Sequence, residues 1–366
     1  MNSNKGVFDL SEVRALIGKE QKISEADTYL AKCPVDASEL RRYALSLEDS
    51  NPLFYEEEYA KNTRWGGIIA PPTFVHTSGA GIALVVVHIP GVDDWPHGNL
   101  FAGSEFDFYL PIRVGDTIRP VTKIYDAVEK NGDFVGPMVL ITAETSFFNQ
   151  GNELVCNWRQ SVMRYSTVNA QKKGAYSKEE IGEMYPQGYP ESKRAVSHAR
   201  GSNPLYYEDV NEGSEVPPMV RHLTVPKIVA SADVSQRIGC ILPFTLPGPG
   251  CYWHYSEGQS WKIRGLPAPM DIGPMRPAQP SQLMTDWIGD DGWLSNLSLQ
   301  VRRPIYAGDT TTWQGKVVNK YVEDGRHCVK CEIRGENQRG QISSKGNATV
   351  ILPSKDEEWT GIPYDG

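Results

Sequence analysis

The side chain best suited to move protons is His254, which lies in the aromatic segment 251–257 (CYWHYSE). An unperturbed imidazole titrates near neutral pH. Two carboxylates follow it, Glu257 three residues and Asp271 seventeen residues further on. A histidine and a carboxylate are suited to general acid–base catalysis. The alternative is ordinary structure, with His254 packed in an aromatic loop and both carboxylates solvated.

A second acidic group, Asp49, opens the segment 49–54 (DSNPLF). It is either an acid–base group or a turn residue whose side chain stabilises the turn at Asn51-Pro52. We expect the turn role. Tyr252 and Tyr255 flank His254, where each either donates a hydrogen bond to a substrate or packs with its hydroxyl satisfied. His76 lies in an apolar stretch, which favours a buried, hydrogen-bonded histidine over a ligand.

Motifs for phosphate, zinc or serine chemistry are absent: there is no Walker A loop, no His-Glu-x-x-His and no Gly-x-Ser-x-Gly. One Cys-x-x-Cys occurs, at Cys328 and Cys331, but a structural zinc site needs four ligands. Residues three apart in a strand point to opposite faces. We therefore expect ordinary cysteines, no metal and no cofactor.

The elements that would position these residues occur twice. Segment 109–118 (YLPIRVGDTI) resembles 302–311 (RRPIYAGDTT), and Asn149 at a later turn corresponds to Asn337. The offsets are 309 − 116 = 193 and 337 − 149 = 188, which indicates a duplicated domain. Each copy continues as strand, polar turn and strand, which is typical of antiparallel hairpins.

Each half also places a helical stretch ahead of its strands. Residues 71–87 are apolar on nearly all sides, which predicts a buried helix with prolines in its first turn, and 280–289 is the counterpart, ended by Gly289. Residues 167–201 are polar and rich in Lys, Glu, Ser and Gly, which is typical of a linker. We predict three parts, at residues 1–166, 167–204 and 205–366.

This layout resembles the MaoC-like hydratases and dehydratases, which have the hotdog fold. The resemblance covers residues 30–352 and is carried by 49–60 and 66–74 in the first half and by 254–255, 264–267 and 285–289 in the second. It implies an α+β tandem (double) hotdog, in which each antiparallel sheet wraps around a long buried helix. It also implies a lyase that acts on an enoyl or 3-hydroxyacyl thioester.

The family's motif, Asp-x-Asn-Pro-(Leu/Ile)-His, is incomplete in both halves. The first half keeps Asp49 but has Phe54 in place of His, and the second keeps His254 but has Pro249 in place of Asp. Because Phe cannot carry a proton, we expect the first half to be non-catalytic and the active site to lie in the second. Asp49 remains the alternative catalytic residue.

The resemblance implies roles for the second-half residues. His254 would be the acid–base residue, with Glu257 or Asp271 replacing the missing Asp. Gly273 would let a thioester oxygen approach the backbone at the start of a helix. The residues expected to bind substrate are Tyr252, Tyr255, Gly273 and Arg264, with Arg264 and Lys262 near a CoA group.

The expected substrate is an acyl-CoA or acyl-carrier thioester with a bulky or aromatic acyl group. A non-catalytic hotdog subunit that binds acyl thioesters, or completes a partner's substrate tunnel, is the alternative, and a thioesterase is a weaker one. The resemblance also implies a homodimer or a partner hotdog subunit.

The net charge and the distribution of apolar residues exclude some classes of binding partner. The formal net charge is −8, from 37 Lys and Arg against 45 Asp and Glu, with no block of like charges, which argues against nucleic acid. The longest apolar run, 79–89, is about half of the ~20 residues that a membrane span needs. Residues 1–12 have no apolar core, so we expect no signal peptide and a soluble cytoplasmic protein with reduced thiols.

Overall fold

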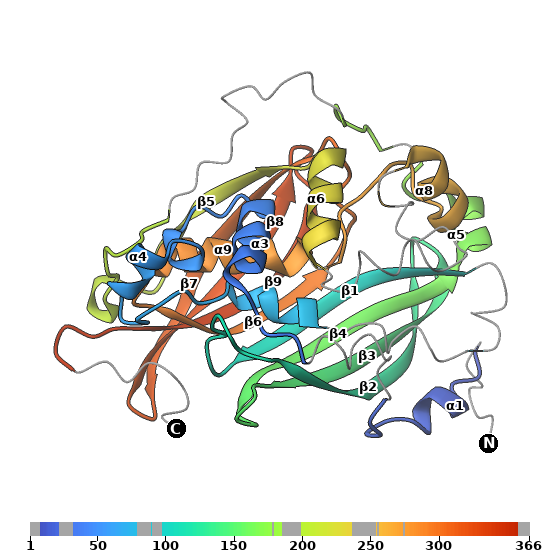
Figure 1. The fold of residues 1–366 in the computed structure, drawn as a ribbon. Helices are drawn as coiled ribbons and strands as arrows, with labels where there is room; N and C mark the ends of the chain where they lie inside the picture. The colour runs from blue at the N-terminus through green and yellow to red at the C-terminus, as the bar shows by residue number, and fades with distance from the viewer. Residues whose placement is uncertain are drawn as a thin grey trace.

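A nine-stranded antiparallel sheet, in the order β2-β3-β4-β1-β6-β9-β8-β7-β5, organises the part of the chain that the computed structural model describes (Figure 1). That part comprises residues 8–21, 32–78, 89, 97–177, 179–184, 199–235, 254, 256–273 and 275–357. The strands of the first half are β1 (His97–Phe108), β2 (Arg119–Gly132), β3 (Gly136–Phe148) and β4 (Leu154–Ser166). Those of the second half are β5 (Glu215–His222), β6 (Trp293–Val301), β7 (Thr310–Glu323), β8 (Arg326–Asn337) and β9 (Ile342–Leu352).

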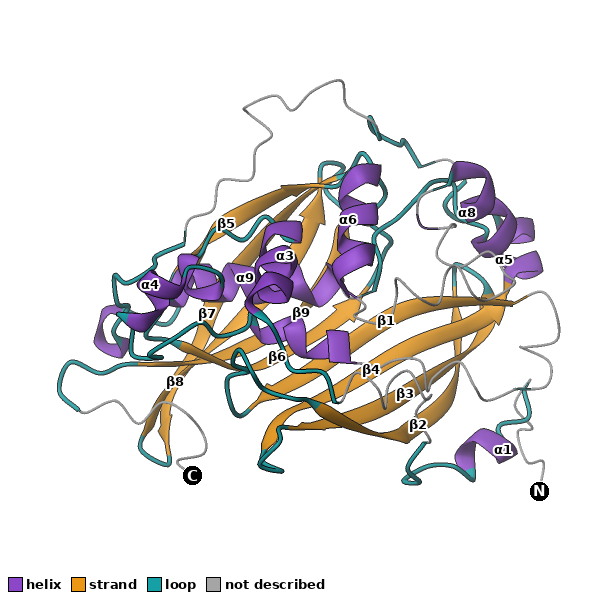
Figure 2. Ribbon diagram, in the orientation of Figure 1, coloured by secondary structure: helices purple, strands orange, loops and turns teal. Residues whose placement is uncertain are grey.

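The helices are short apart from α3, α6 and α9, which lie together on one side of the sheet (Figure 2). The α-helices are α1 (Ser11–Arg14), α3 (Ala37–Ser46), α4 (Glu57–Lys61), α5 (Thr167–Lys173), α6 (Val225–Ser235), α8 (Glu257–Arg264) and α9 (Met275–Ile288). The 3-10 helices are η1 (Pro52–Phe54), η2 (Pro72–Ser78) and η5 (Tyr207–Asp209). The described part of the chain has no helix that is both long and apolar enough to cross a membrane.

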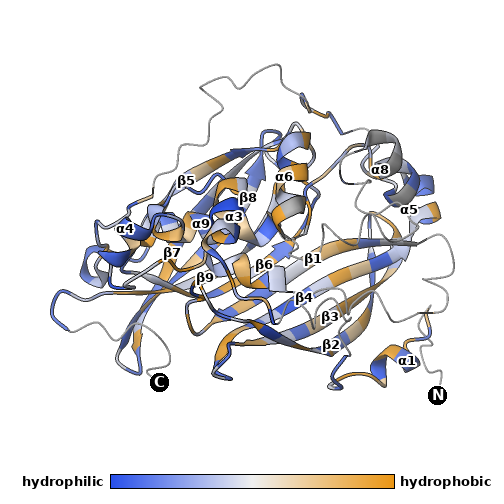
Figure 3. Cartoon of the chain, viewed as in Figure 1, coloured by the Kyte–Doolittle hydropathy of each residue, from blue (hydrophilic) through white to orange (hydrophobic). Residues whose placement is uncertain are grey.

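Alternation of apolar and polar residues along the strands gives the sheet its two faces (Figure 3). In β3 buried and partly exposed positions alternate over most of its length. In the first half the inner face carries Phe106, Trp158 and Ile141, which are all buried. The core therefore lies between this inner face and the helices.

The predicted repeat is seen in two corresponding turns, one at Gly115-Asp116 and one at Gly308-Asp309. Asp116 Oδ2 accepts a hydrogen bond from Arg113 N at 2.7 Å, and Asp309 Oδ2 accepts one from Tyr306 N at 3.0 Å. The glycine before each aspartate has a positive φ, 97° at Gly115 and 95° at Gly308, where a side chain would be strained. The same residue types therefore build the same turn in both halves.

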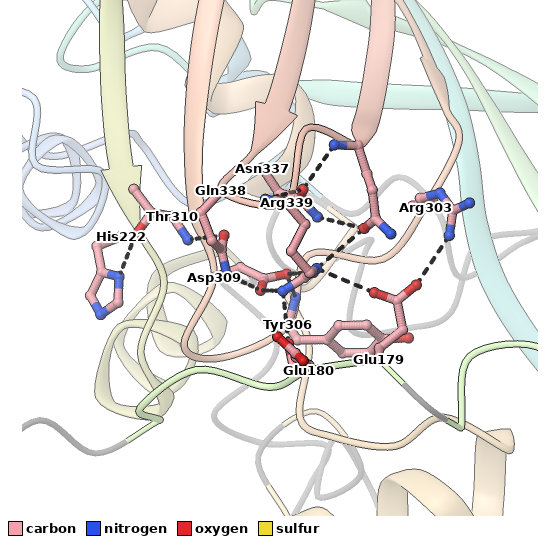
Figure 4. A network of polar contacts seen from close by, with 11 residues as sticks. Glu179, Glu180, His222, Arg303, Tyr306, Asp309, Thr310, Asn337, Gln338 and Arg339 are labelled. Atoms are coloured by element: carbon pink, nitrogen blue, oxygen red, sulfur yellow. Dashed lines mark hydrogen bonds and ion pairs between the residues drawn. The ribbon is translucent and has the colours of Figure 1, made fainter.

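The Asp309 turn carries an additional polar network (Figure 4). Arg339 donates to both carboxylate oxygens of Asp309, at 2.6 and 2.9 Å, and also contacts Glu179 at 3.3 Å. Glu179 pairs in turn with Arg303 at 3.1 Å. This network attaches the segment 179–184, within the predicted linker, to the second half.

The predicted linker contains structure. Helix α5 packs against β4 and α8, and its Ala170 is fully buried. The strand order does not test boundaries at residues 166 and 204, so the three-part division stays a prediction.

The two predicted core helices differ from expectation. Helix α9 begins at Met275, five residues before the predicted start, and contains Pro280. Pro280 has no N–H to bond the Arg276 carbonyl, but twelve of the fourteen side chains of α9 are buried, which outweighs that loss. In the first half, η2 occupies the start of the predicted helix 71–87, and positions 79–87 lie outside the described residues.

Candidate active site

His254 lies just before α8 and is buried. Its ring Nδ1 is 3.1 Å from the Met270 carbonyl oxygen, and Met270 N donates to the His254 carbonyl at 3.2 Å. Since a carbonyl only accepts, Nδ1 carries the hydrogen. In the neutral ring, Nε2 therefore holds the lone pair that could accept a proton.

Burial determines the charge of this histidine. Loss of hydration lowers the pKa of His254 to about 3, and the nearby Arg264 acts in the same direction. The expectation of titration near neutral pH applies only to an unperturbed imidazole and is wrong for this site. His254 is neutral at physiological pH and is suited to act first as a base.

Asp271 lies in the turn between Met270 and α9. Arg276 donates to both of its oxygens, Nε to Oδ2 at 2.5 Å and Nη2 to Oδ1 at 2.6 Å, and both residues are buried. A buried, bidentate pair of this kind fixes a turn firmly. The alternative that Asp271 is solvated is therefore wrong, and a catalytic role stays a prediction.

Gly273 brings the turn against the first half of the chain. A Cβ atom placed on Gly273 would lie 3.1 Å from Cβ and Cδ2 of Phe101 on β1. That distance is shorter than ordinary van der Waals contact, so a side chain here would displace Phe101. The turn after His254 therefore lies at the junction of the two halves.

The other second-half candidates are only partly described. Tyr252 and Tyr255 lie outside the described residues, and Glu257 is described only as the first residue of α8. Arg264 ends α8, and its carbonyl accepts the Tyr165 hydroxyl at 2.9 Å. Lys262 is exposed on the same helix.

Asp49 is buried and shapes the loop that follows it. Its Oδ1 accepts from Asn51 N at 3.0 Å, and Asn51 Oδ1 accepts from Leu53 N at 3.0 Å at the start of η1. Burial raises the pKa of Asp49 to about 6, while Arg221 opposes that rise. The contacts are those of the expected turn residue.

Asp290 lies two residues after the end of α9 and was not singled out from the sequence. Its Oδ1 accepts from Asn51 Nδ2 at 3.0 Å, its Oδ2 from the Tyr59 hydroxyl at 2.5 Å, and its carbonyl from Trp65 Nε1 at 2.7 Å. Asp290 therefore fixes the first-half loop to the end of α9. The sequence predicted that this helix ends at Gly289, but it gave no indication that the next residue contacts the first half.

Phe54, at the position of the missing histidine, is buried in a small pocket. The pocket has a volume of about 40 Å³, which is room for only a few water molecules. Most of its lining is apolar, including Phe54, Ile69, Val75, Phe108, Ile112, Val155 and Trp293. This pocket is too small for an acyl chain.

His76 is buried, as expected. The expectation that it is also hydrogen-bonded is wrong, because neither ring nitrogen has a hydrogen-bond partner in the described part of the chain. Burial lowers the pKa of His76 to about 4.

Comparison with known proteins agrees with this architecture. Residues 26–158 match the FAS1-like, dehydratase domain region. A UPF0336 protein of Saccharopolyspora erythraea is 27% identical over 138 residues, which are 37% of this chain and 83% of the relative. Another, from Streptomyces coelicolor, is 28% identical over 133 residues, 36% of this chain and 84% of the relative.

Solved structures resemble almost the whole chain. A MaoC-like dehydratase superposes with a TM-score of 0.67 and 20% identity, covering 94% of this chain and 100% of the other. A Mycobacterium tuberculosis protein described as a double hotdog superposes with a TM-score of 0.55 and 11% identity, covering 87% of this chain and 92% of the other. At these identities the likeness establishes the fold.

The protein is thus an α+β double hotdog protein. Its resemblance in fold to the MaoC-like dehydratases is confirmed, and residues 26–158 in its first half match the FAS1-like, dehydratase domain region.

Proposed function

We propose that the protein is a carbon–oxygen lyase, a hydratase or dehydratase that acts on an enoyl or 3-hydroxyacyl thioester in the second half. The contrast between two corresponding positions carries this proposal. Phe54 lines a small and mostly apolar pocket, whereas His254 presents a buried, neutral imidazole beside the turn that leads into α9. Only the second position offers a group that exchanges protons.

The chemistry needs one proton removed from the α carbon and one delivered to the β oxygen. In dehydration, His254 Nε2 takes the α proton and the carbon–carbon double bond forms as the β carbon–oxygen bond breaks. The imidazolium then gives its proton to the departing hydroxyl, which leaves as water. Hydration runs through the same steps in reverse, so one histidine can serve both transfers.

The thioester oxygen gathers negative charge during these steps. We place it at the turn 271–273, where the backbone N–H groups of Ile272 and Gly273 and the start of α9 favour an anion, since Asp271 N already donates to the Ile305 carbonyl. Gly273 leaves room for the oxygen because it has no side chain. Asp271 acts by holding this turn through Arg276, and Glu257 remains a candidate for a second proton-transfer group.

The substrate is proposed to be CoA-linked or bound to an acyl carrier. Arg264 and Lys262, in the last turn of α8, are the cations nearest His254 in the chain and are proposed to contact the CoA phosphates. A bulky or aromatic acyl group remains the proposal for the part beyond the thioester.

Two observations favour the alternative, an acyl-thioester-binding protein without turnover. Both oxygens of Asp271 are engaged by Arg276, and neither half has the complete acid–histidine motif. This alternative predicts binding of thioesters with no change in their absorbance.

The proposal is tested by incubating the protein with a panel of enoyl-CoA and 3-hydroxyacyl-CoA thioesters. Hydration lowers the enoyl absorbance, and dehydration raises it. His254→Ala should lower kcat by roughly 10²-fold or more, as expected for loss of a general acid–base group, while the melting temperature stays close to that of the wild type. His327→Ala, which alters a histidine on β8, is the matched control and should leave kcat unchanged. Absence of turnover in the wild type would instead support the binding protein.

A further inference from the structure

A groove crosses the outer face of the sheet, which is the face turned away from α3, α6 and α9 (Figure 2). Glu332 and Arg334 are exposed in this groove, whereas Ile333 between them is buried in the core. All nine strands contribute lining residues, and the groove has a volume of about 1360 Å³. Because neighbouring strands lie about 4.8 Å apart, the groove extends for about 38 Å along the sheet. We call it the outer groove, and it is large enough for a segment of another polypeptide.

The lining of the outer groove carries more positive than negative charge. Six cations line it against four carboxylates, whereas the whole chain has a formal net charge of −8. The cations are Lys130, Arg159, Arg302, Lys316, Arg334 and Lys345. An acidic partner is therefore attracted to this groove and repelled by the protein as a whole.

Three of these cations lie on neighbouring strands of the second half. Arg334 on β8 lies directly opposite Lys345 on β9, and Arg302 directly follows β6, which pairs with β9. The two arginines donate only to side-chain amides, Arg334 Nε to Gln314 Oε1 at 2.8 Å and Arg302 Nη2 to Gln300 Oε1 at 2.6 Å. Within the described part of the chain, none of the three forms an ion pair. We call Arg302, Arg334 and Lys345 the cationic row.

The cations of the first half differ in this respect, as Arg159 shows. This arginine on β4 contacts Glu144 at 2.8 Å and Glu105 at 3.5 Å. Its charge is therefore already balanced by carboxylates of the same face. The charge available to a partner lies in the second half of the groove.

The first half also shows that the fold itself does not need cations at these positions. The residues 188 positions before Arg334 and Lys345 are Ser146 and Asn157, at the same separation as Asn149 and Asn337. They lie opposite one another on β3 and β4, and Ser146 Oγ donates to Asn157 Oδ1 at 2.7 Å. Like charges directly opposite one another destabilise a sheet, so the pair of cations costs stability that the neutral pair does not. An anionic partner offsets that cost.

We propose that the outer groove binds an acidic α-helix of another protein, with the carboxylates of that helix on the cationic row. The row crosses three strands and so spans about 9.6 Å. Acidic residues at positions i, i+4 and i+7 of a helix share one face and span about 10.5 Å. An extended chain matches less well, because its same-face residues are about 6.7 Å apart. A second copy of this chain also matches less well, because two concave faces do not fill one another.

This surface is separate from the candidate active site. Neither His254 nor the turn 271–273 lines the outer groove. The inference therefore goes beyond the proposed function and does not depend on it.

Two fluorescent peptides test the inference with the full chain. Both are capped, alanine-based helices of about 20 residues, or about 30 Å. One carries glutamate at every third or fourth position along one face, and the other carries glutamine at the same positions. In fluorescence anisotropy at about 20 mM salt, we expect the glutamate peptide to bind at least about tenfold more tightly, and this preference should shrink at about 0.5 M salt. Equal affinity of the two peptides would overturn the inference, as would failure of the glutamate peptide to bind.

Variants then locate the binding surface. Arg334→Gln/Lys345→Gln should weaken binding of the glutamate peptide by about fivefold or more, as loss of two exposed ion pairs gives. Its melting temperature should not fall, because the change removes a repulsion between opposite positions of the sheet. Arg41→Gln/Arg42→Gln, which removes two exposed cations from α3, is the matched control and should leave binding unchanged. Equal weakening by both double variants would show a response to net charge alone and would overturn the inference.

Two further measurements distinguish the acidic helix from other occupants. We expect a single-stranded oligodeoxynucleotide of the same charge to displace the glutamate peptide poorly, and displacement as strong as by unlabelled glutamate peptide would identify a general polyanion surface instead. In sedimentation velocity, we expect Arg334→Gln/Lys345→Gln to leave the oligomeric state unchanged. A dimer that this double variant dissociates would assign the face to a second copy of the chain and overturn the inference.

Discussion

Glu105 and Ser298 lie opposite one another where β1 pairs with β6. They are also 193 residues apart (298 − 105), the same separation as Asp116 and Asp309 in the repeated turns. A residue that pairs with its own counterpart in the repeat marks an axis of internal twofold symmetry. The two halves therefore associate through β1 and β6 as two symmetric subunits would.

The register around this pair has the same symmetry. Gly103 pairs with Gln300, and Asp107 pairs with Asn296. The counterparts of Gly103 and Asp107 are residues 296 and 300, so exchanging the halves exchanges the two pairs. Corresponding positions in the two halves can therefore be compared directly by mutation.

The two aspartate turns provide the first such comparison. Asp116 and Asp309 accept the same two kinds of hydrogen bond, from a backbone N–H and from Gln150 or Gln338. Only Asp309 is fully buried and paired with Arg339. We expect Asp309→Ala to destabilise the protein by about 2 kcal/mol more than Asp116→Ala, because it leaves Arg339 without its main partner.

Urea unfolding of both variants measures this difference. Equal losses of stability would mean that the Arg339 contact contributes nothing beyond the shared turn. Arg339→Met supplies the control, since Asp309→Ala in that background should cost about as much as Asp116→Ala.

Much of the fold follows from local patterns in the sequence. The Gly-Asp turns and the hairpins at Asn149 and Asn337 are specified by residues within a few positions of each other, so their repetition predicted a duplicated domain, and the resemblance to the MaoC-like family implied that each copy is a hotdog. The start of α9 was not predictable in the same way. Pro280 indicated a first turn, and only burial of the whole helix explains why it lies inside.

The site was predictable to a smaller extent. His254 was found through the broken motif, but its low pKa depends on burial, which no short segment reveals. The partner of Asp271 is Arg276, five residues on, and neither residue type identifies a buried ion pair by itself. The contact of Gly273 with Phe101 joins segments 172 residues apart (273 − 101), so it could come only from the tertiary structure.

The Asp271–Arg276 pair leads to a second prediction. Asp271→Ala should lower the free energy of unfolding by about 3–5 kcal/mol, because it leaves a buried guanidinium without its carboxylate. The double variant Asp271→Ala/Arg276→Met should recover at least half of that loss in urea unfolding.

The same double variant separates a structural from a catalytic role for Asp271. If Asp271 holds the turn, kcat should fall by less than about tenfold once the protein is folded. A fall of about 100-fold or more in the folded double variant would show that Asp271 transfers a proton.

The raised pKa of Asp49 leads us to expect that the stability of the folded protein depends on pH. Its pKa is about 6 in the folded protein against 3.8 for an ordinary aspartate, so the folded state binds the proton more tightly. Stability from this group is therefore lost as the pH rises from about 4 to above 6, by about 3 kcal/mol at most. Asp49→Asn keeps an oxygen for Asn51 N and removes the charge.

We therefore expect the melting temperature of Asp49→Asn, relative to the wild type, to rise between pH 4 and pH 7.5. His254 and His76 titrate alike in both proteins, so their contributions cancel in the difference. A difference that is flat or falls with pH would contradict the burial of an ionised Asp49. Turnover of Asp49→Ala should change little, because we place no proton transfer there.

The close approach of Gly273 to Phe101 provides the last prediction. Gly273→Val should lower kcat/KM by about tenfold or more, because the added methyl groups displace Phe101 and shift the turn that faces the thioester oxygen. Phe101→Ala in the same chain makes space for valine and should restore part of the activity. Gly258→Ala is the control, since a Cβ on Gly258 in α8 meets no atom within 4 Å and should leave kcat/KM unchanged. If Gly273→Val is fully active, the thioester oxygen does not approach this turn, and the donors that we place there must lie elsewhere.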